Sequence, residues 1–186
     1  AALRRNLALE DEAGVAALAA GLEVEFLAGA DGRSRILLDG MEAGHDLRAE
    51  TCGNAASRVA ALPAVRAALL QRQRDFRQPP GLIADGRDMG TVVFPDAELK
   101  LFLIASAEER ARRRHKQLSE QGVNANLEIL AGEIAERDAR DRQRASAPLR
   151  PAADAEVLDT THWSIAEVCE RALALAARRL GLPENC

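Results

Sequence analysis

The segment GLIADGRDMG, residues 81–90, places charged side chains among glycines in a pattern that suits phosphate recognition. Arg87 can donate two parallel hydrogen bonds to a phosphate. The carboxylate of Asp88 can accept a hydrogen bond from an exocyclic amine such as that of cytosine. A capping turn with a local Asp–Arg pair is the alternative interpretation of the same residues.

The same segment has the glycine spacing of a Walker A loop, but its other features exclude that motif. Arg87 stands where the loop requires lysine, and Asp88 where it requires serine or threonine. A Walker A loop follows a strand and leads into a helix, whereas Gly81 precedes the apolar residues and Pro95 follows soon after. We expect instead that residues 81–85 form a buried parallel strand. Asp85 would then lie at its carboxyl end, where open α/β sheets bind ligands.

Two arginine-rich segments follow. In ERDARDRQR, residues 136–144, a helix would bring four charged residues into one arc: Arg137, Arg140, Asp141 and Arg144. Like charges at this spacing repel each other unless an anion lies among them. A solvated surface helix with Arg137–Asp141 and Asp138–Arg142 pairs explains the spacing equally well.

The second basic segment, ERARRRHKQ at residues 109–117, is joined to the first through SEQGVNAN at residues 119–126. Together they indicate a helical hairpin. Hinged, arginine-rich elements of this kind close over a nucleoside triphosphate in phosphoryl-transfer enzymes. Nucleic-acid binding by an exposed basic helix is the alternative, but the interleaved acidic residues and the 3% aromatic content disfavour it.

The remaining elements indicate an α/β protein with a parallel sheet, because strands and helices alternate. Further strands are expected in ELKLFLIAS and AEVLDT, residues 98–106 and 155–160. Helices are expected over residues 10–22, 48–76 with a new start at Pro63, 106–122, 126–144 and 164–180. Residues 22–40 break the alternation: they predict a β-hairpin turning at Asp31-Gly32, which we interpret as a small inserted β subdomain.

Composition limits the functional classes. The net charge of −4 argues against non-specific nucleic-acid binding. The three cysteines are scattered and form no zinc or disulfide pattern. No apolar run approaches the ~20 residues of a membrane span, and no signal peptide is evident. We expect a cytoplasmic monomer without nucleic-acid or membrane partners.

Three long segments resemble the bacterial cytidylate kinase family: residues 53–74, 81–114 and 136–161. The resemblance extends over essentially the whole chain, the β insertion included. It implies a nucleoside monophosphate kinase fold, with a parallel sheet flanked by helices. The core would comprise residues 1–22 and 48–186, with a helical lid at about 107–145 and an inserted β subdomain of the monophosphate-binding region at 23–47. The implied reaction is phosphorylation of CMP or dCMP by ATP, with Mg²⁺.

The resemblance also implies roles for individual residues. Ser57, Arg66 and Asp88 match positions that read the cytosine ring. Arg137 and Asp141 match positions that hold the ribose, and Arg87 and Arg144 match positions that clamp the CMP phosphate. Asp85 corresponds to an acidic residue near the magnesium ion and its waters. Arg113 and Arg114 are candidates for contacts to ATP or to the transferred phosphoryl group. The arginines among these residues form the expected catalytic set, because phosphoryl transfer depends on alignment and charge stabilisation. We therefore expect no catalytic base.

One departure from the family pattern is large. The family begins with a strand, a glycine-rich P-loop with its lysine and a helix, but no G-x-x-x-x-G-K sequence occurs in these 186 residues. Ala1 corresponds to a point just after those elements. We expect the chain to lack this segment, to leave strand edges unpaired and to be a poor or inactive kinase by itself. A non-catalytic CMP-binding or structural remnant of a nucleotide kinase is the alternative, and a kinase for UMP or AMP is a variant of the first hypothesis.

Overall fold

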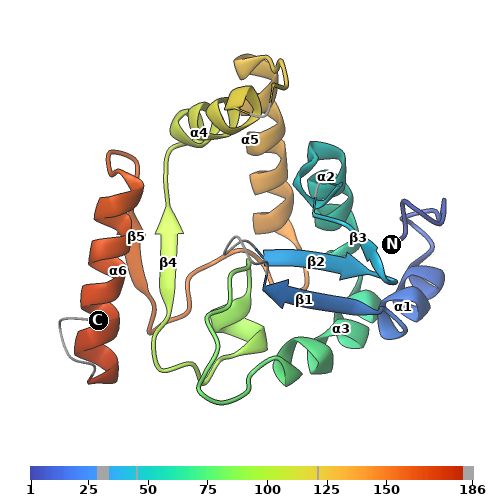
Figure 1. The fold of residues 1–186 in the computed structure, drawn as a ribbon, viewed down its shortest axis with the longest axis horizontal. Helices are drawn as coiled ribbons and strands as arrows, with labels where there is room; N and C mark the ends of the chain where they lie inside the picture. Colours follow the sequence, from blue (N-terminus) through green and yellow to red (C-terminus); the bar gives the residue numbers. More distant parts are fainter. Residues whose placement is uncertain (29–33, 45, 121, 182–186) are drawn as a thin grey trace. The chain divides into compact units, whose positions relative to one another are not determined.

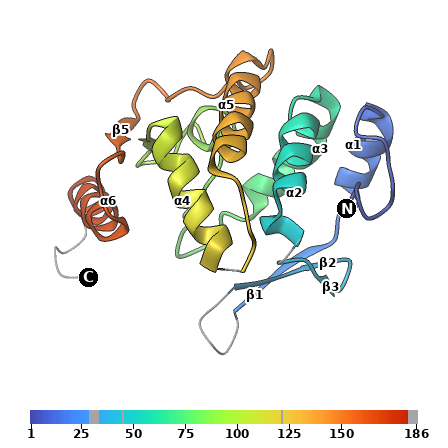
Figure 2. The same cartoon turned by 90° about the horizontal axis from the view of Figure 1, so that it is seen from above.

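The computed structural model describes residues 1–28, 34–44, 46–120 and 122–181 (Figures 1 and 2). The chain forms two compact units. The first comprises residues 1–83 with 144–146, and the second comprises residues 84–143 with 147–186. None of the described helices combines the length and the apolar character that a membrane crossing requires.

The first unit combines helices with an antiparallel sheet. Its helices are α1 (Glu12–Ala20), α2 (Glu50–Val59) and α3 (Pro63–Asp75), with a short 3-10 helix at Asp46–Arg48. The sheet has the order β1 (Val24–Ala28), β2 (Ser34–Leu38) and β3 (Met41–Glu42). Phe26 lies opposite Ile36, which confirms the predicted hairpin. Its predicted turn at Asp31-Gly32 lies outside the described residues.

Helices α1 and α3 lie side by side (Figure 2), and a small apolar core joins them. Val15 and Ala19 of α1 are buried together with Val65 of α3. The starts of both helices follow local chemistry. The Asp11 carboxylate accepts a hydrogen bond from the Gly14 amide at 3.0 Å, and Pro63 occupies the first turn of α3, where its missing N–H is not needed. The predicted helical break at Pro63 is confirmed.

The second unit is built on two parallel strands, β4 (Leu101–Ile104) and β5 (Glu156–Asp159). A single π-helical turn at Met89–Val93 precedes β4. Between the strands the chain forms two helices, α4 (Ala107–Glu120) and α5 (Leu127–Gln143), and α6 (Ile165–Leu180) follows β5 (Figure 1). Leu101 lies opposite Glu156 and Ile104 opposite Asp159. The predicted α/β class with a parallel sheet flanked by helices is confirmed.

The predicted strand at residues 81–85 is wrong. These residues form no strand, and the Ile83 side chain is 101% exposed. A strand exists only where a neighbour supplies hydrogen-bond partners for its backbone, and the described sheet of this unit contains β4 and β5 alone. The boundary between the two units also falls directly after Ile83. Asp85 therefore lies in an exposed loop and not at the end of a sheet strand.

The helix starts agree with the sequence. Ser106 Oγ accepts from the Glu109 amide at 3.2 Å at the start of α4, and Asn126 Oδ1 accepts from the Glu128 amide at 2.8 Å at the start of α5. At α6, the Ser164 hydroxyl accepts from the Glu167 amide, and the Glu167 carboxylate accepts from the Ser164 amide at 2.7 Å. The predicted capping box is confirmed.

The capping box makes α6 sensitive to acid. The backbone amide of Ser164, followed by its hydroxyl, lowers the pKa of Glu167 below its ordinary value of 4.5. Because the folded pKa is depressed, the contribution of Glu167 to stability is present above pH 4.5. It is lost as the pH falls through the lower folded value.

We predict that Ser164→Ala destabilises the fold by about 1 kcal/mol at pH 7, because it removes the side-chain cap. The midpoint of thermal unfolding, followed by circular dichroism, should fall by about 2–4 °C. The deficit should narrow as the pH falls below 4.5 and through the lowered pKa of folded Glu167, where its carboxylate becomes protonated. Ser119→Ala is the matched control, since Ser119 is exposed within α4 and caps no helix. A deficit that is the same at pH 7 and in acid would contradict the coupling between Ser164 and Glu167.

Candidate active site

Two buried carboxylates face the interior of the second unit from α5. Asp138 is 8% exposed and Asp141 is 2% exposed. Their spacing of three residues places them on one face of the helix. Buried carboxylates require oppositely charged, hydrogen-bonding partners, so the residues that meet them define the polar interior of this unit.

Three of the predicted site residues lie together around one carboxylate: Asp141 itself, Arg87 and Arg137. Arg87 Nε donates to Asp141 Oδ2 at 3.2 Å, and Arg137 Nε lies 4.0 Å from the same oxygen. Two guanidinium groups thus surround one carboxylate. Within the described part of the chain, Arg137 Nε is buried and has no hydrogen-bond partner. Native proteins rarely leave a buried donor in this state, so an additional acceptor such as a ligand oxygen fits beside it.

Asp138 is held by a different arginine. Arg110 of α4 donates through Nη1 to Asp138 Oδ1 at 2.9 Å and through Nη2 to Oδ2. Arg142, the partner expected from helical spacing, lies 3.9 Å away and its side chain is 66% exposed. The expected Arg137–Asp141 and Asp138–Arg142 pairs are both present, but at the outer limit of an ion pair. The pairing with Arg110, which is 28 residues away in the sequence, was not foreseen.

The loop that contains Arg87 positions Asp88 as well. Asp88 is buried, and its carbonyl accepts from the Val92 amide at 2.9 Å as the π-helical turn begins. Asp85 is exposed in the same loop. Within the described ranges, no three His, Cys, Asp or Glu side chains come together in a way that could hold a metal ion. A lone carboxylate such as Asp85 suits Mg²⁺ that keeps its waters and arrives with a nucleotide.

The remaining residues implied to touch substrate belong to the first unit. Ser57 is buried on α2. Arg66, on α3, donates through Nη1 to the Ala60 carbonyl at 3.3 Å. Arg144, which directly follows α5, is buried and groups with the first unit. The structure thus brings Arg87, Arg137 and Asp141 together within the second unit. Ser57, Arg66 and Arg144 belong to the first unit.

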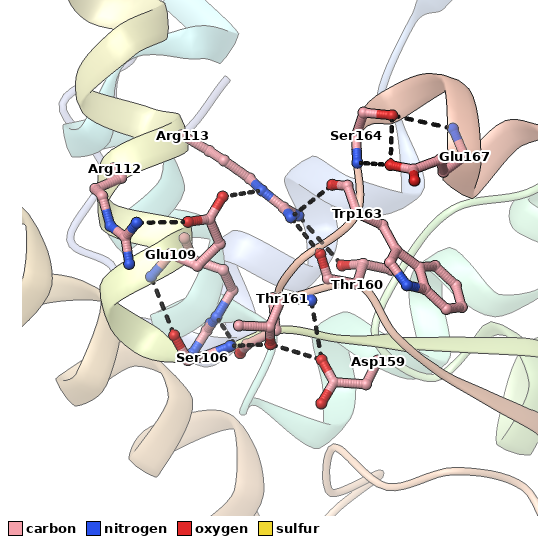
Figure 3. Close-up of polar contacts among 12 residues, drawn as sticks. Ser106, Glu109, Arg112, Arg113, Asp159, Thr160, Thr161, Trp163, Ser164 and Glu167 are labelled. Carbon is pink, nitrogen blue, oxygen red and sulfur yellow. Dashed lines mark hydrogen bonds and ion pairs between the residues drawn. The ribbon is translucent and has the colours of Figure 1, made fainter.

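Arg113 bonds to several groups of the protein itself. Figure 3 shows its guanidinium directed at the segment after β5. Nη1 donates to Thr160 Oγ1 at 3.2 Å, Nη2 donates to the carbonyls of Thr160 and Trp163, and Nε donates to Glu109 at 2.9 Å. These contacts fasten the first turns of α4 to the chain after β5. Arg114, the other candidate, lies on the same helix with Nη1 3.5 Å from Gln117 Oε1.

A second set of contacts connects the carboxyl ends of the two strands (Figure 3). Thr161 Oγ1 donates to Asp159 at 2.6 Å and accepts from the Ser106 amide at 3.1 Å. The hydrogen bonds from the hydroxyl and then the amide of Thr161 lower the pKa of Asp159. Sequence reasoning missed Asp159 and Thr161. Their position at the end of a predicted strand is the signal that could have found them, because polar groups at strand ends face the ligand side of an α/β sheet.

Comparison with known sequences identifies the family of this chain. The sequence model of the cytidylate kinase family matches residues 1–178. The chain belongs to the cytidylate kinase family. It is 56% identical over 183 residues to the cytidylate kinase of Yersinia enterocolitica, covering 98% of this chain and 79% of that protein.

Two other relatives give the same result. Identity is 59% over 173 residues with the cytidylate kinase of Bordetella bronchiseptica, covering 93% of this chain and 75% of that protein. It is 56% over 185 residues with the cytidylate kinase of Serratia proteamaculans, covering 100% and 80%. The resemblance seen in the sequence is confirmed, and with it the prediction of a kinase, a nucleotide-binding transferase.

We predict that Arg113→Ala lowers the free energy of unfolding by about 2 kcal/mol, because charged hydrogen bonds to the Thr160 and Trp163 carbonyls are lost. Chemical denaturation followed by circular dichroism measures the change. Arg112→Ala is the matched control: Arg112 lies next to Arg113, is mostly exposed and pairs with Glu109 at 3.2 Å within the same helix. Its loss should cost about 0.5 kcal/mol or less. Equal effects of the two substitutions would show that the Arg113 contacts contribute nothing specific.

Proposed function

We propose that this chain phosphorylates CMP and dCMP with ATP as the phosphate donor. The observation that supports this most directly is the group of Arg87, Arg137 and Asp141. Two guanidiniums share one buried carboxylate, so the group has an excess of positive charge and suits an anionic ligand. It belongs to a chain of the cytidylate kinase family, whose relatives are named for CMP phosphorylation.

The chemistry proposed for each residue follows from its type and its surroundings. Asp88 accepts a hydrogen bond from the cytosine amine, while Ser57 and Arg66 complete recognition of the ring. Asp141 accepts from a ribose hydroxyl and Arg137 donates to one, which gives the buried Arg137 Nε its acceptor. Arg87 and Arg144 clamp the phosphate of CMP, since guanidinium groups bind phosphate oxygens in pairs.

Catalysis in this proposal is alignment plus charge stabilisation. The arginines hold the acceptor phosphate in line and offset the charge that spreads over the transferred group. Mg²⁺, when bound with ATP, supplies further stabilisation of the phosphate charge, and Asp85 is the residue that would hold its waters. Arg114 remains a candidate contact to the transferred phosphoryl group. Arg113 is a weaker candidate, because its described hydrogen bonds already go to Glu109, Thr160 and Trp163.

The architecture proposed for the enzyme follows the family. Residues 1–22 and 48–186 form the kinase core, residues 23–47 form the inserted β subdomain, and α4 with α5 forms the lid at about 107–145. We further propose a cytoplasmic monomer that acts on small molecules and binds neither nucleic acid nor membranes. A non-catalytic CMP-binding protein is the second candidate.

We predict that Asp88→Asn weakens CMP binding by about tenfold, because the amide is a poorer acceptor for the cytosine amine than the carboxylate. The same change should narrow the preference for CMP over UMP, since the new amide can donate to the uracil carbonyl that replaces the amine. Calorimetric titration with both nucleotides measures the two affinities. Asp96→Asn, an exposed position in the same unit, is the matched control. An unchanged ratio of the CMP and UMP dissociation constants would remove Asp88 from base recognition.

A second prediction separates catalysis from binding. A polypeptide of these 186 residues should bind CMP yet turn it over slowly with ATP, because it contains no P-loop backbone or lysine to cradle the ATP phosphates. A coupled assay of ADP release measures turnover, and titration with CMP on the same preparation verifies a competent substrate site. Turnover typical of a kinase, roughly 1–100 s⁻¹, would refute the predicted deficiency and would favour the enzyme over the non-catalytic candidate.

A further inference from the structure

In the ion pair of Arg110 and Asp138, each carboxylate oxygen accepts from its own guanidinium nitrogen. Neither residue contacts substrate in the proposed function. Arg110 Nε donates to the Ala105 carbonyl at 3.2 Å, directly after β4. Two parallel hydrogen bonds fix both the position and the rotation of a carboxylate. Asp138 is therefore fixed relative to the end of the sheet.

This connection controls where α5 lies. Asp138 is one helical turn before Asp141 on the same buried face, and it directly follows Arg137. A helix moves as a rigid element over one turn, so a rotation or shift that displaced Asp138 would displace both neighbours. The described side-chain contacts of Asp141 and Arg137 are longer, at 3.2 and 4.0 Å, while the Asp141 carbonyl accepts from the Leu149 amide at 2.8 Å. Among the described side-chain contacts, the Arg110–Asp138 pair is thus the closest one that sets the orientation of this part of α5.

We propose that Asp138, through Arg110, is a positioning residue that sets Arg137 and Asp141 for recognition of the nucleotide sugar. The proposal rests on the proposed function for the sugar contacts of those two residues. Asp138 and Arg110 touch no substrate in this scheme. Their effect is on discrimination between CMP and dCMP, because the 2′-hydroxyl is the only group that distinguishes the two sugars.

The test compares CMP and dCMP dissociation constants by calorimetric titration. Asp138→Asn should weaken CMP binding by about tenfold and bring the dCMP/CMP ratio of dissociation constants toward one. Arg110→Lys should act in the same direction, because a lysine is a point charge and cannot hold both oxygens. Arg142→Gln is the matched control. It removes the looser partner of the same carboxylate, 3.9 Å away, and should leave both constants unchanged.

A role confined to charge balance or folding predicts a different pattern. Arg110→Lys would then be silent, and any loss in Asp138→Asn would affect CMP and dCMP equally. The double variant Asp138→Asn/Asp141→Asn separates the two explanations further. Because Asp138 acts through both Arg137 and Asp141 in this proposal, the loss of CMP affinity in the double variant should be smaller than the sum of the two single losses. Additive losses would overturn the proposal. Circular dichroism verifies folding, and Arg110→Lys provides the test if Asp138→Asn does not fold.

A ligand-free measurement distinguishes failure of this inference from failure of the proposed function. The Arg87 Nε–H group donates to Asp141, and its NMR signal can be assigned with Arg87→Lys. In the parent protein and in Arg142→Gln this proton should exchange slowly with solvent, and in Asp138→Asn it should exchange at least about tenfold faster. If the parent protein binds neither nucleotide, the proposed function fails, and this exchange rate decides the positioning role. An unchanged rate would overturn it.

Discussion

The second unit is organised by the need to neutralise two carboxylates that α5 buries. A buried carboxylate without a partner is strongly destabilising, so each requires an arginine from a different segment of the chain. Asp138 holds Arg110 of α4, and Asp141 holds Arg87 of the loop before the π-helical turn. These two pairs connect three segments that the backbone alone would leave independent. These buried ion pairs therefore stabilise the unit and also form its candidate site.

The contacts are unevenly distributed along α4, and that distribution suits a lid. In the first half of the helix, Arg110 bonds to α5 and Arg113 bonds to the chain after β5, while Glu109 accepts from Arg113 within the helix. Toward the other end, Lys116 and Glu120 form an exposed ion pair at 3.9 Å, which contributes little stability. A hinged element needs a fixed base and a weakly held tip. The polar side-chain contacts along α4 follow this arrangement, while Leu118 near the end of the helix is buried.

Local signals predicted the elements well, and non-local partners explain what was missed. The caps at Ser106 and Ser164 and the helix start at Pro63 depend on a few neighbouring residues, so the sequence reveals them. Residues 81–85 have a strand-like composition, but a strand requires a partner, and sequence composition does not show whether one is present. Likewise, helical spacing identified Arg142 as a partner of Asp138, whereas the closer partner, Arg110, lies on another helix. Similarly, the sequence shows an arginine at position 113 but not that its side chain donates to a carbonyl directly after β5.

The chain's strong preference for arginine has a physical basis in these contacts. Its one well-buried lysine, Lys100, donates from a single nitrogen to the Pro95 carbonyl at 2.6 Å and to Asp154 at 2.7 Å. That geometry neutralises charge but sets no orientation, since an ammonium group is a point charge. Arg110 and Arg113 instead bond in several fixed directions at once. Arginine on the α4–α5 hairpin thus supplies direction as well as charge, whereas Lys100 supplies charge alone.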